Sequence, residues 1–251
     1  MHSTRTNIIR FTELDSTIDY ALRNIDKLHD RDVVLAETQT KGRGRFDRKW
    51  ISHIPDNIYI SLVLKPAAET GEAESLMNIS QLMSVSVCDV FETYGISAGL
   101  KWPNDVLVDG HKICGLLSRG ILEGNRIRAC ILGIGINCNM ERKDLQDINQ
   151  PAVSMNIILG HPVDRDMLLE CLLETFFRQY RPFLKEGFSL IREAYSEKSI
   201  LLGRPIEVEL PGRRITGTAR GFSEHGSLVV ASDSGEETEI RAGDVRCASV
   251  V

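Results

Sequence analysis

Apolar and polar positions follow a strand, helix, strand order along the first sixty residues. Residues 8–11 (IIRF) predict a short strand, and residues 16–28 carry apolar side chains at helical spacing behind a Ser/Thr cap. Residues 33–37 form a β-branched run, and residues 57–65 (NIYISLVLK) alternate as a strand does. The glycine- and arginine-rich stretch at 41–49 is therefore expected to be a loop between strands.

The middle of the chain predicts one long helix followed by closely spaced strands. Residues 73–94 have the apolar spacing of an amphipathic helix that ends near Gly95. Short strand-like segments separated by Gly, Asp and Asn then follow at 100–102, 106–108, 113–118 and 126–136. These segments lie too close together for helical crossovers, so we expect antiparallel pairing.

The last part of the chain changes from helical to strand patterning. Residues 141–164 are rich in polar and turn-forming residues, and residues 165–197 predict two helices broken at Gly187. From Leu201 onward, short strand-like runs bounded by glycine or charged turns predict a small five-stranded barrel of about 50 residues. We therefore expect two unequal domains.

The composition is that of a globular protein, with 42% hydrophobic and 26% charged residues. A net charge of −5 does not attract polyanions, so we expect no nucleic-acid partner. We find neither a signal-peptide core nor an apolar run of roughly 18 residues, and therefore expect a cytoplasmic protein with no membrane partner. The six cysteines are scattered without a CxxC pair, and we expect small buried hydrophobes in a reducing compartment.

The first candidate for chemistry is the segment 41–50, KGRGRFDRKW. Its cationic residues are Lys41, Arg43, Arg45, Arg48 and Lys49. Glycines at 42 and 44 allow a tight turn that brings backbone N–H groups toward an anion, and arginines supply bidentate donors for phosphate or carboxylate. A short basic run is more commonly a solvated turn or an RNA contact. Its single occurrence between strand-like runs, with Trp50 at its end, favours a packed anion-binding loop.

Three further segments carry candidate chemistry. Residues 101–105 (KWPND) and 112–115 (KICG) place two lysines around Asp105; lysines stabilise charge on phosphoryl oxygens, and an aspartate can hold Mg²⁺. A plain hairpin turn at WPND is compatible with this function. Residues 132–138 (LGIGINC) have glycines at alternate strand positions. Such glycines mark the close approach of another backbone or a ligand, or else a bulge or a tight sheet crossing. No P-loop, GxSxG or HExxH motif occurs.

In combination, these motifs resemble the biotin protein ligase family. The resemblance rests on Asp15-Ser16-Thr17, Gln39, GRGRxxRxW at 42–50, KWPND at 101–105, KxxGxL at 112–117 and GxGxN at 133–137, over roughly residues 8–140. It implies an α/β catalytic domain at 1–199, with a central mixed β-sheet and flanking helices of the class II synthetase and biotin–lipoate ligase type. It also implies an SH3-like β-barrel at 200–251.

The resemblance implies a two-step reaction and a role for each motif residue. Biotin and ATP would give biotinyl-5'-AMP, and a lysine of a biotin carboxyl carrier protein would then take the biotin. The residues implied for biotin are Ser16, Thr17, Gln39, Gly42, Arg43, Lys112 and Gly115. Those implied for ATP are Arg43, Arg45, Arg48, Trp50, Lys101, Asn104 and Asn137. Arg45, Lys112 and Lys101 would be catalytic, and Asp105 would bind Mg²⁺.

Two positions depart from the family pattern. Ile18 stands where the family usually has Asn, and Asp47 stands where it usually has Gly. We expect Ile18 to face the core from the first helical turn, and Asp47 to pair with Arg45 or Arg48. We also expect loop 41–49 to be mobile without ligand, because it must close over the adenylate to exclude water.

The family's bifunctional members carry an N-terminal helix-turn-helix, for which the roughly ten residues before the first strand are too few. We therefore expect no DNA-binding repressor role. A homodimer paired through the catalytic sheet stays open. So do two other functions: a lipoate or octanoyl transferase of the same fold, and a non-catalytic protein such as an RNA-binding module or a degenerate ligase.

Overall fold

The computed structural model describes residues 6–66, 71–124 and 126–247. Within them, seven strands form a sheet in the order β1-β2-β3-β7-β6-β5-β4. The strands are β1 (Ile8–Leu14), β2 (Val33–Gln39), β3 (Ile58–Leu64), β4 (Gly99–Lys101), β5 (Asp105–Val108), β6 (His111–Glu123) and β7 (Arg126–Ile136). Strands β1 and β2 are parallel and the other neighbours are antiparallel. The expected central mixed sheet, including the antiparallel pairing of its later strands, is confirmed.

Helices and short 3₁₀ turns connect these strands. The α-helices are α1 (Thr17–Arg23), α2 (Ile79–Thr93), α3 (Met155–Leu159), α4 (Arg165–Glu186) and α5 (Arg192–Glu197). The 3₁₀ turns are η1 (Arg45–Asp47), η2 (Gly71–Asn78), η3 (Asp144–Asp147) and η4 (Gly187–Leu190). No helix in the described ranges is both long enough and apolar enough to cross a membrane.

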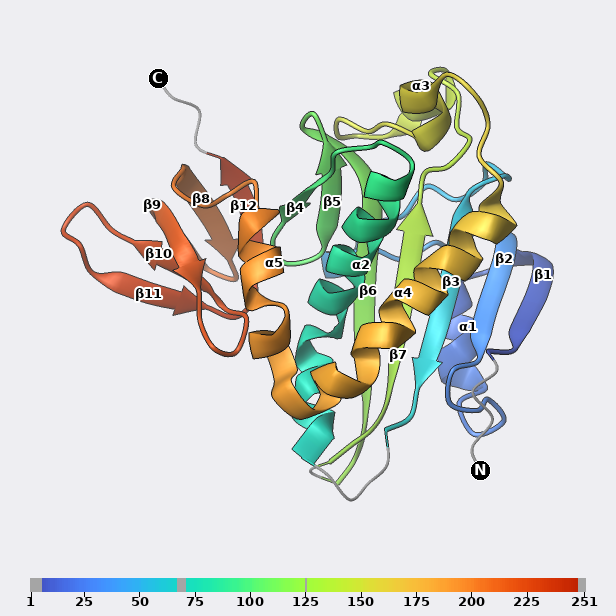
Figure 1. Ribbon diagram of the computed structural model, residues 1–251, viewed down its shortest axis with the longest axis horizontal. Coiled ribbons are helices and arrows are strands. Elements are labelled where there is room, and N and C mark those ends of the chain that lie inside the picture. The colour runs from blue at the N-terminus through green and yellow to red at the C-terminus, as the bar shows by residue number, and fades with distance from the viewer. Residues whose placement is uncertain (1–5, 67–70, 125, 248–251) are drawn as a thin grey trace.

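Alternation along β7 gives the large sheet two different faces. One face packs into the main core with α2 and α4 through Cys130, Leu132, Ile134 and Ile136. On the other face, Ala129 and Ile131 pack in a smaller core with α1. Figure 1 shows α2 and α4 on one side of the sheet and α1 on the other. Gly133 and Gly135 continue the α1 side of β7, where missing side chains leave room for a site.

Several predicted elements differ in extent from the observed ones. The predicted helix 16–28 stops at Arg23, because the chain turns and Lys65 Nζ donates to the carbonyls of Ile25 (2.7 Å) and Leu28. The predicted helix 73–94 begins as η2 and becomes α-helical at Ile79. Strand β6 runs far beyond the predicted 113–118, since its outer half pairs with β7 as an exposed hairpin that lacks an apolar pattern.

The predicted break between two helices at Gly187 is confirmed, with Gly187 at φ 63°. The turn-rich stretch 141–164 also contains η3 and α3, which the sequence did not predict. Of the six cysteines, Cys171 and Cys247 are exposed, so the expectation that all are buried is wrong for these two. Both lie on elements with a solvent-facing side, whereas the other four lie in the core.

The C-terminal strands form a second, antiparallel sheet in the order β11-β10-β9-β8-β12. They are β8 (Pro205–Leu210), β9 (Arg213–Phe222), β10 (Leu228–Ala231), β11 (Glu237–Ile240) and β12 (Asp244–Cys247). This sheet lies beside α5, as Figure 1 shows. Phe222 packs edge-on against Phe188 and Tyr195, with ring centroids 6.1 and 4.9 Å away. Aromatic packing therefore fixes the C-terminal sheet against the main domain.

Candidate active site

A cavity of about 880 Å³ lies on the α1 side of the sheet. Its walls include the basic loop 42–50, the turn between β4 and β5, the segment 148–152 and the start of β12. The candidate residues that line it are Ser16, Thr17, Gln39, Arg43, Arg45, Arg48, Trp50, Lys101, Asn104, Asp105, Lys112, Gly115 and Asn137. Gly42 is not among the lining residues. The fold therefore gathers residues from six separated motifs around one space.

The basic loop is a tight hairpin. Gly44 N donates to Arg48 O (2.7 Å), and Trp50 N donates to Gly42 O (3.0 Å). A Cβ on Gly42 would lie 2.4 Å from Trp50 O and from Ser52 Oγ, so this position needs glycine for a close backbone approach. Gly42 thus acts in the base of the hairpin and not at the cavity wall.

Acidic side chains from other elements hold two arginines of this loop. Arg43 Nε lies 3.0 Å from Asp19 Oδ2 in α1, and Arg48 bonds to Asp244 in β12. Burial raises the pKa of Asp244, but the hydrogen bond and charge of Arg48 more than reverse this, so its pKa lies below the ordinary value. The pairing expected for Asp47 concerns a side chain outside the described part of the structure.

Trp50 lies against a strip of the sheet that has no side chains, formed by Gly115, Gly133 and Gly135. Gly115 and Gly135 pair across β6 and β7, and a Cβ on either would lie 2.6 or 2.5 Å from the Trp50 ring. The close approach expected at the alternate glycines is therefore made by an aromatic side chain. Trp50 Nε1 is buried and has no hydrogen-bond partner among the described residues. A buried donor without an acceptor is costly, so a ligand acceptor here would be favoured.

Ile18 fills the remaining part of the strip. A Cβ on Gly133 would lie 2.4 Å from Ile18 Cδ1, and Ile18 is buried in the α1 core. The expectation that Ile18 faces the core from the first helical turn is confirmed. Ile18 is also one of the residues that line the cavity.

Two cations face the turn between β4 and β5. Lys112 Nζ lies 2.7 Å from Asp105 Oδ1 and 5.1 Å from the centroid of the Trp50 ring. Arg45 Nη1 donates to Asn104 Oδ1 (3.1 Å), and Asn104 Nδ2 donates to Leu116 O (2.6 Å). Burial lowers the pKa of Arg45, and the charges of Asp105 and Asp244 oppose this. An arginine remains cationic under such a shift, so the cavity carries buried positive charge.

The turn itself is a hairpin, because Lys101 and Asp105 pair as the last and first residues of β4 and β5. The plain structural interpretation of WPND is therefore confirmed together with its place in the cavity. Trp102 points away from the cavity and donates from Nε1 to Gly226 O of the C-terminal sheet (3.0 Å). Gln81 Nε2 donates to the same oxygen (3.1 Å).

The inner end of the cavity is polar. Thr17 N donates to Gln39 Oε1 (2.8 Å), Thr17 Oγ1 lies 3.2 Å from the same oxygen, and Ser61 Oγ lies 2.9 Å from Thr17 Oγ1. Ser16 caps α1 by accepting from Asp19 N (3.3 Å). A ligand group reaching this end meets fixed hydrogen-bonding atoms.

Asn137 ties the cavity wall together. Its Nδ2 donates to Val153 O (3.1 Å) and lies 3.4 Å from Lys112 O. Lys112 N also bonds to Pro151 O, so the segment 148–153 is held against β6. Asn137 therefore has a structural role in the wall, and its nucleotide-facing role stays a prediction.

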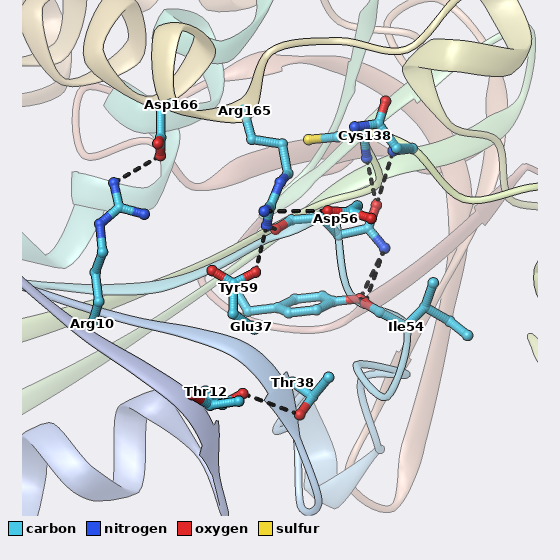
Figure 2. Close-up of polar contacts among 12 residues, drawn as sticks. Arg10, Thr12, Glu37, Thr38, Ile54, Asp56, Tyr59, Cys138, Arg165 and Asp166 are labelled. Atoms are coloured by element: carbon cyan, nitrogen blue, oxygen red, sulfur yellow. Dashed lines mark hydrogen bonds and ion pairs between the residues drawn. The ribbon is translucent and has the colours of Figure 1, made fainter.

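A polar network beside the site fixes the chain that follows the basic loop. Figure 2 shows Arg165, in the first turn of α4, reaching toward Glu37 (2.9 Å) and Asp56 (3.3 Å). Asn57 Oδ1 accepts from Cys138 N (2.7 Å) and from Asn139 N (3.2 Å). The backbone directly after Asn137 is therefore anchored to the 52–57 segment.

Some lining residues were not found from the sequence. The segment 148–152 has only turn-like composition, and Asp244 and Arg246 lie in β12, far along the chain from the motifs. Ser61 does not line the cavity but bonds to Thr17 from an ordinary alternating strand. No local pattern distinguishes these residues, because their role comes from tertiary packing.

Two family models match the chain. The biotin/lipoate A/B protein ligase family matches residues 9–137, just over half of the chain, and the biotin protein ligase C-terminal domain matches residues 201–246. A biotin–[acetyl-CoA-carboxylase] ligase of Paracoccus denitrificans is 30% identical over 231 residues, covering 89% of this chain and 93% of that protein.

Other relatives are longer, and solved structures share the fold. The bifunctional ligase/repressor BirA of Bacillus subtilis is 30% identical over 204 residues, and the match covers 81% of this chain but only 62% of that protein. A biotin protein ligase from Aquifex aeolicus, solved with biotin and ATP, superposes with a TM-score of 0.84 at 30% identity, covering 96% of this chain and 99% of that one. This structural match extends over both sheets.

Proposed function

This chain belongs to the biotin/lipoate A/B protein ligase family, and from that premise we propose that it is a biotin protein ligase. It forms biotinyl-5'-AMP from biotin and ATP and passes the biotin to a lysine of a biotin carboxyl carrier protein. The observation that carries the proposal is the single cavity in which Arg43, Arg45 and Lys112 meet a polar inner end. The similar proteins named as biotin ligases support the choice of acid.

The geometry suits a reaction between two anions. A carboxylate oxygen of biotin attacks the α-phosphorus of ATP, and the bond to pyrophosphate breaks. Arg45, Lys112 and Lys101 oppose the repulsion between the reactants and stabilise the charge that builds on the phosphoryl oxygens. In the second step, the acceptor amine attacks the acyl carbonyl, loses a proton and releases AMP.

Lys112 is held ready by Asp105. Both side chains are mostly buried, with 16% and 19% exposure, and their ion pair keeps the ammonium inside the cavity before ligands bind. A biotin carboxylate or an α-phosphate oxygen then offers this ammonium a second anion. Because the Lys112 ammonium also lies over the Trp50 ring, its position is constrained from two sides.

Magnesium fits the cavity only as a partner of the nucleotide. The described residues contain no group of three or more side chains that could hold a metal ion. Asp105 and Asp244 are lining carboxylates, and each is already paired with a cation. Mg²⁺ commonly binds through one or two carboxylates and substrate phosphates, so Asp105 would supply one oxygen while the ion neutralises the phosphates.

The proposal extends to the setting of the enzyme. The chain has a net charge of −5, which does not attract DNA. We therefore propose that it acts as a ligase and not as a DNA-binding repressor. All six cysteines are free thiols, which supports a reducing compartment such as the cytoplasm.

The direct test incubates the chain with biotin, ATP, Mg²⁺ and a biotin carboxyl carrier domain, and looks for a biotinylated lysine by mass spectrometry. Pyrophosphate release that depends on lipoate or octanoate in place of biotin would favour the transferase alternative. No release with any of these acids would favour a non-catalytic binding protein.

The site assignment is tested by Arg45→Ala and Lys112→Ala. Each is expected to slow pyrophosphate release at least about 100-fold, because each removes a preorganised cation from the reacting centre. The control is Lys143→Ala, which removes an exposed lysine paired with Glu141 outside the cavity and should leave the rate unchanged. Full activity in both cavity variants would contradict the assignment.

A further inference from the structure

Ser61 is a buried polar residue that the mechanism above does not use. It lies in the middle of β3 with 0% of its surface exposed, and it does not line the cavity. Its Oγ is 2.9 Å from Thr17 Oγ1, and Thr17 is its hydrogen-bond partner among the described residues. Ser61 therefore reaches the cavity only through Thr17.

The direction of each hydrogen bond in this chain of groups can be worked out. The backbone N–H of Thr17 is a donor, so the Gln39 side-chain atom 2.8 Å away must be the amide oxygen. That oxygen only accepts, so the Thr17 hydroxyl must donate its one proton to it. Thr17 Oγ1 is then an acceptor toward Ser61, and the Ser61 hydroxyl must be the donor.

This order fixes what a ligand meets at the inner end. The Gln39 amide oxygen is fully engaged, so its Nε2 presents N–H donors on a residue that lines the cavity. Thr17 Oγ1 has used its proton and offers only a remaining lone pair. The wall therefore presents a donor beside an acceptor, at fixed positions.

We propose that Ser61 is a positioning residue that holds the Thr17 hydroxyl in this orientation and so makes the inner wall select a cyclic urea ring. This inference rests on the proposed function and concerns the choice of acid. A cyclic urea places a carbonyl acceptor directly beside an N–H donor, which is the complement of the Gln39 and Thr17 pair. A dithiolane ring or a plain alkyl chain carries neither group.

The surroundings explain why Ser61 matters for this orientation. Gly133 lies opposite Ser61 in the sheet, and the space that its side chain would fill is taken by Ile18. Val63, the next residue on the same face of β3, is in the apolar core with α1. In such apolar surroundings, a hydroxyl without a hydrogen-bond partner lowers the stability of the fold. The hydrogen bond between Ser61 and Thr17 therefore keeps both hydroxyls in one orientation.

The same polarity disfavours apolar acids. An apolar ring at this wall removes water from Gln39 Nε2 and Thr17 Oγ1 and returns no hydrogen bond. Sites built to bond a polar substrate group can reject an analogue that lacks it by about 10⁴-fold. Ser61 contributes to that rejection by preventing Thr17 from rotating away.

The test compares Ser61→Ala with Ser61→Thr, which keeps the hydroxyl, in the full chain with biotin, octanoate and ATP. Ser61→Ala is expected to raise KM for biotin about five- to tenfold, the usual effect of one lost hydrogen bond, with kcat and the KM for ATP within about twofold. Its preference for biotin over octanoate, measured as the ratio of kcat/KM values, should fall. Ser61→Thr should restore both values.

Ser86→Ala is the matched control. Ser86 is equally buried and also loses one hydrogen bond, from Oγ to Leu82 O (3.0 Å) in α2. Ser61→Cys serves if Ser61→Ala does not fold, since a thiol fills the space but donates weakly, and it should show the same KM change. An unchanged KM for biotin, or a change equal to that of Ser86→Ala, would overturn the inference. A wild-type chain that forms no biotinyl adenylate would instead overturn the proposed function.

Discussion

At the scale of single residues, the site depends on side chains that are absent as much as on those present. Gly115, Gly133 and Gly135 leave a strip of bare backbone on which Trp50 and Ile18 lie. The strip sets the depth of the cavity, because the Trp50 ring and the Ile18 side chain lie directly on the backbone of the sheet. Trp50 in turn supports Lys112 through its ring face. A change in the strip is therefore expected to shift the Lys112 ammonium.

Gly135→Ala is expected to displace Trp50, since the new Cβ would lie 2.5 Å from the ring. We expect a ten- to hundredfold loss of adenylate formation, roughly the effect of 1–3 kcal/mol of overpacking. Tryptophan emission should shift toward the red, and the change reports on Trp50 because Trp102, the other tryptophan, is buried elsewhere. Gly120→Ala in β6 is the control, because nothing lies within 4 Å of its Cβ, and it should change neither signal.

A second residue-scale feature links stability to acid. Asp15 bonds to both Nη1 and Nη2 of Arg23 (2.8 Å each), and Arg23 is the main cause that lowers the Asp15 pKa to about 2. An unfolded aspartate titrates near 3.9. The folded pKa is the lower one, so the pair stabilises the protein above about pH 4 and this contribution is lost as pH falls from 4 to 2.

Asp15→Asn should therefore lower the free energy of unfolding at pH 7 by at most about 1 kcal/mol, since the pair is largely exposed and screened by solvent. The difference from wild type should vanish near pH 2. Urea unfolding at pH 7, 4 and 2 measures it. A difference that grows as the pH falls would contradict the assigned ion pair.

At the scale of elements, the sequence predicted most of what depends on local pattern. A β-branched run marked β2, alternation marked β3, and strand-like spacing between turn residues marked β7. The break at Gly187 followed from glycine within a helical pattern. The early end of α1 could not be predicted, because Ile25 and Leu28 remain buried after the helix stops. These two residues are buried in the turn that follows the helix. Their spacing therefore matches a helical pattern although the chain there is not helical.

The residues of the candidate site also fall into those that the sequence predicted and those that it did not. The motif residues were found because short runs of cations, glycines and turn residues are visible in sequence, and the fold places them in one cavity. Ser61 and Asp244 were missed since each acts through a residue distant in the chain, Thr17 and Arg48 respectively. Their contribution appears only when β3 packs against α1 and β12 reaches the basic loop.

The turn at 223–227 is the element that docks the C-terminal sheet. Gly226 O accepts from both Trp102 Nε1 and Gln81 Nε2, and Asn78 Nδ2 donates to His225 O. Trp102 belongs to the same turn as Asn104, which bonds to Arg45. The docking turn therefore supports the part of the cavity wall that contains Asn104 and Arg45.

Gly226→Ala should loosen this docking. Gly226 has φ +72°, and an added Cβ would lie 2.6 Å from Gln81 Oε1 and 3.0 Å from the Phe188 ring. Gly235→Ala is the matched control, with φ +86° and nothing within 4 Å. Both variants carry the left-handed backbone cost of about 1–2 kcal/mol, but only Gly226→Ala should lose a further 1–3 kcal/mol or so from the clash. Urea denaturation gives both values, and equal losses would contradict the docking role.

At the scale of the whole molecule, opposite charges are separated between surface and cavity. The chain is acidic overall, with a net charge of −5, yet its cavity is lined by several arginines and lysines. Asp19 in α1 and Asp244 in β12 hold the basic loop from two separate parts of the fold. The local field of such a cavity attracts small anions although the net charge of the chain is negative.

The four buried cysteines report on the integrity of the main core. Cys88, Cys114, Cys130 and Cys138 are buried, and burial raises the pKa of Cys88, Cys130 and Cys138 to about 12. At pH 8 these thiols are protonated and shielded, so they should not react with a disulfide reagent. Cys171 and Cys247 are exposed. The folded protein should therefore show two fast thiols and the protein in urea six, while Cys171→Ser with Cys247→Ser should show none when folded. A third fast thiol in the folded protein would mean that the main core opens readily.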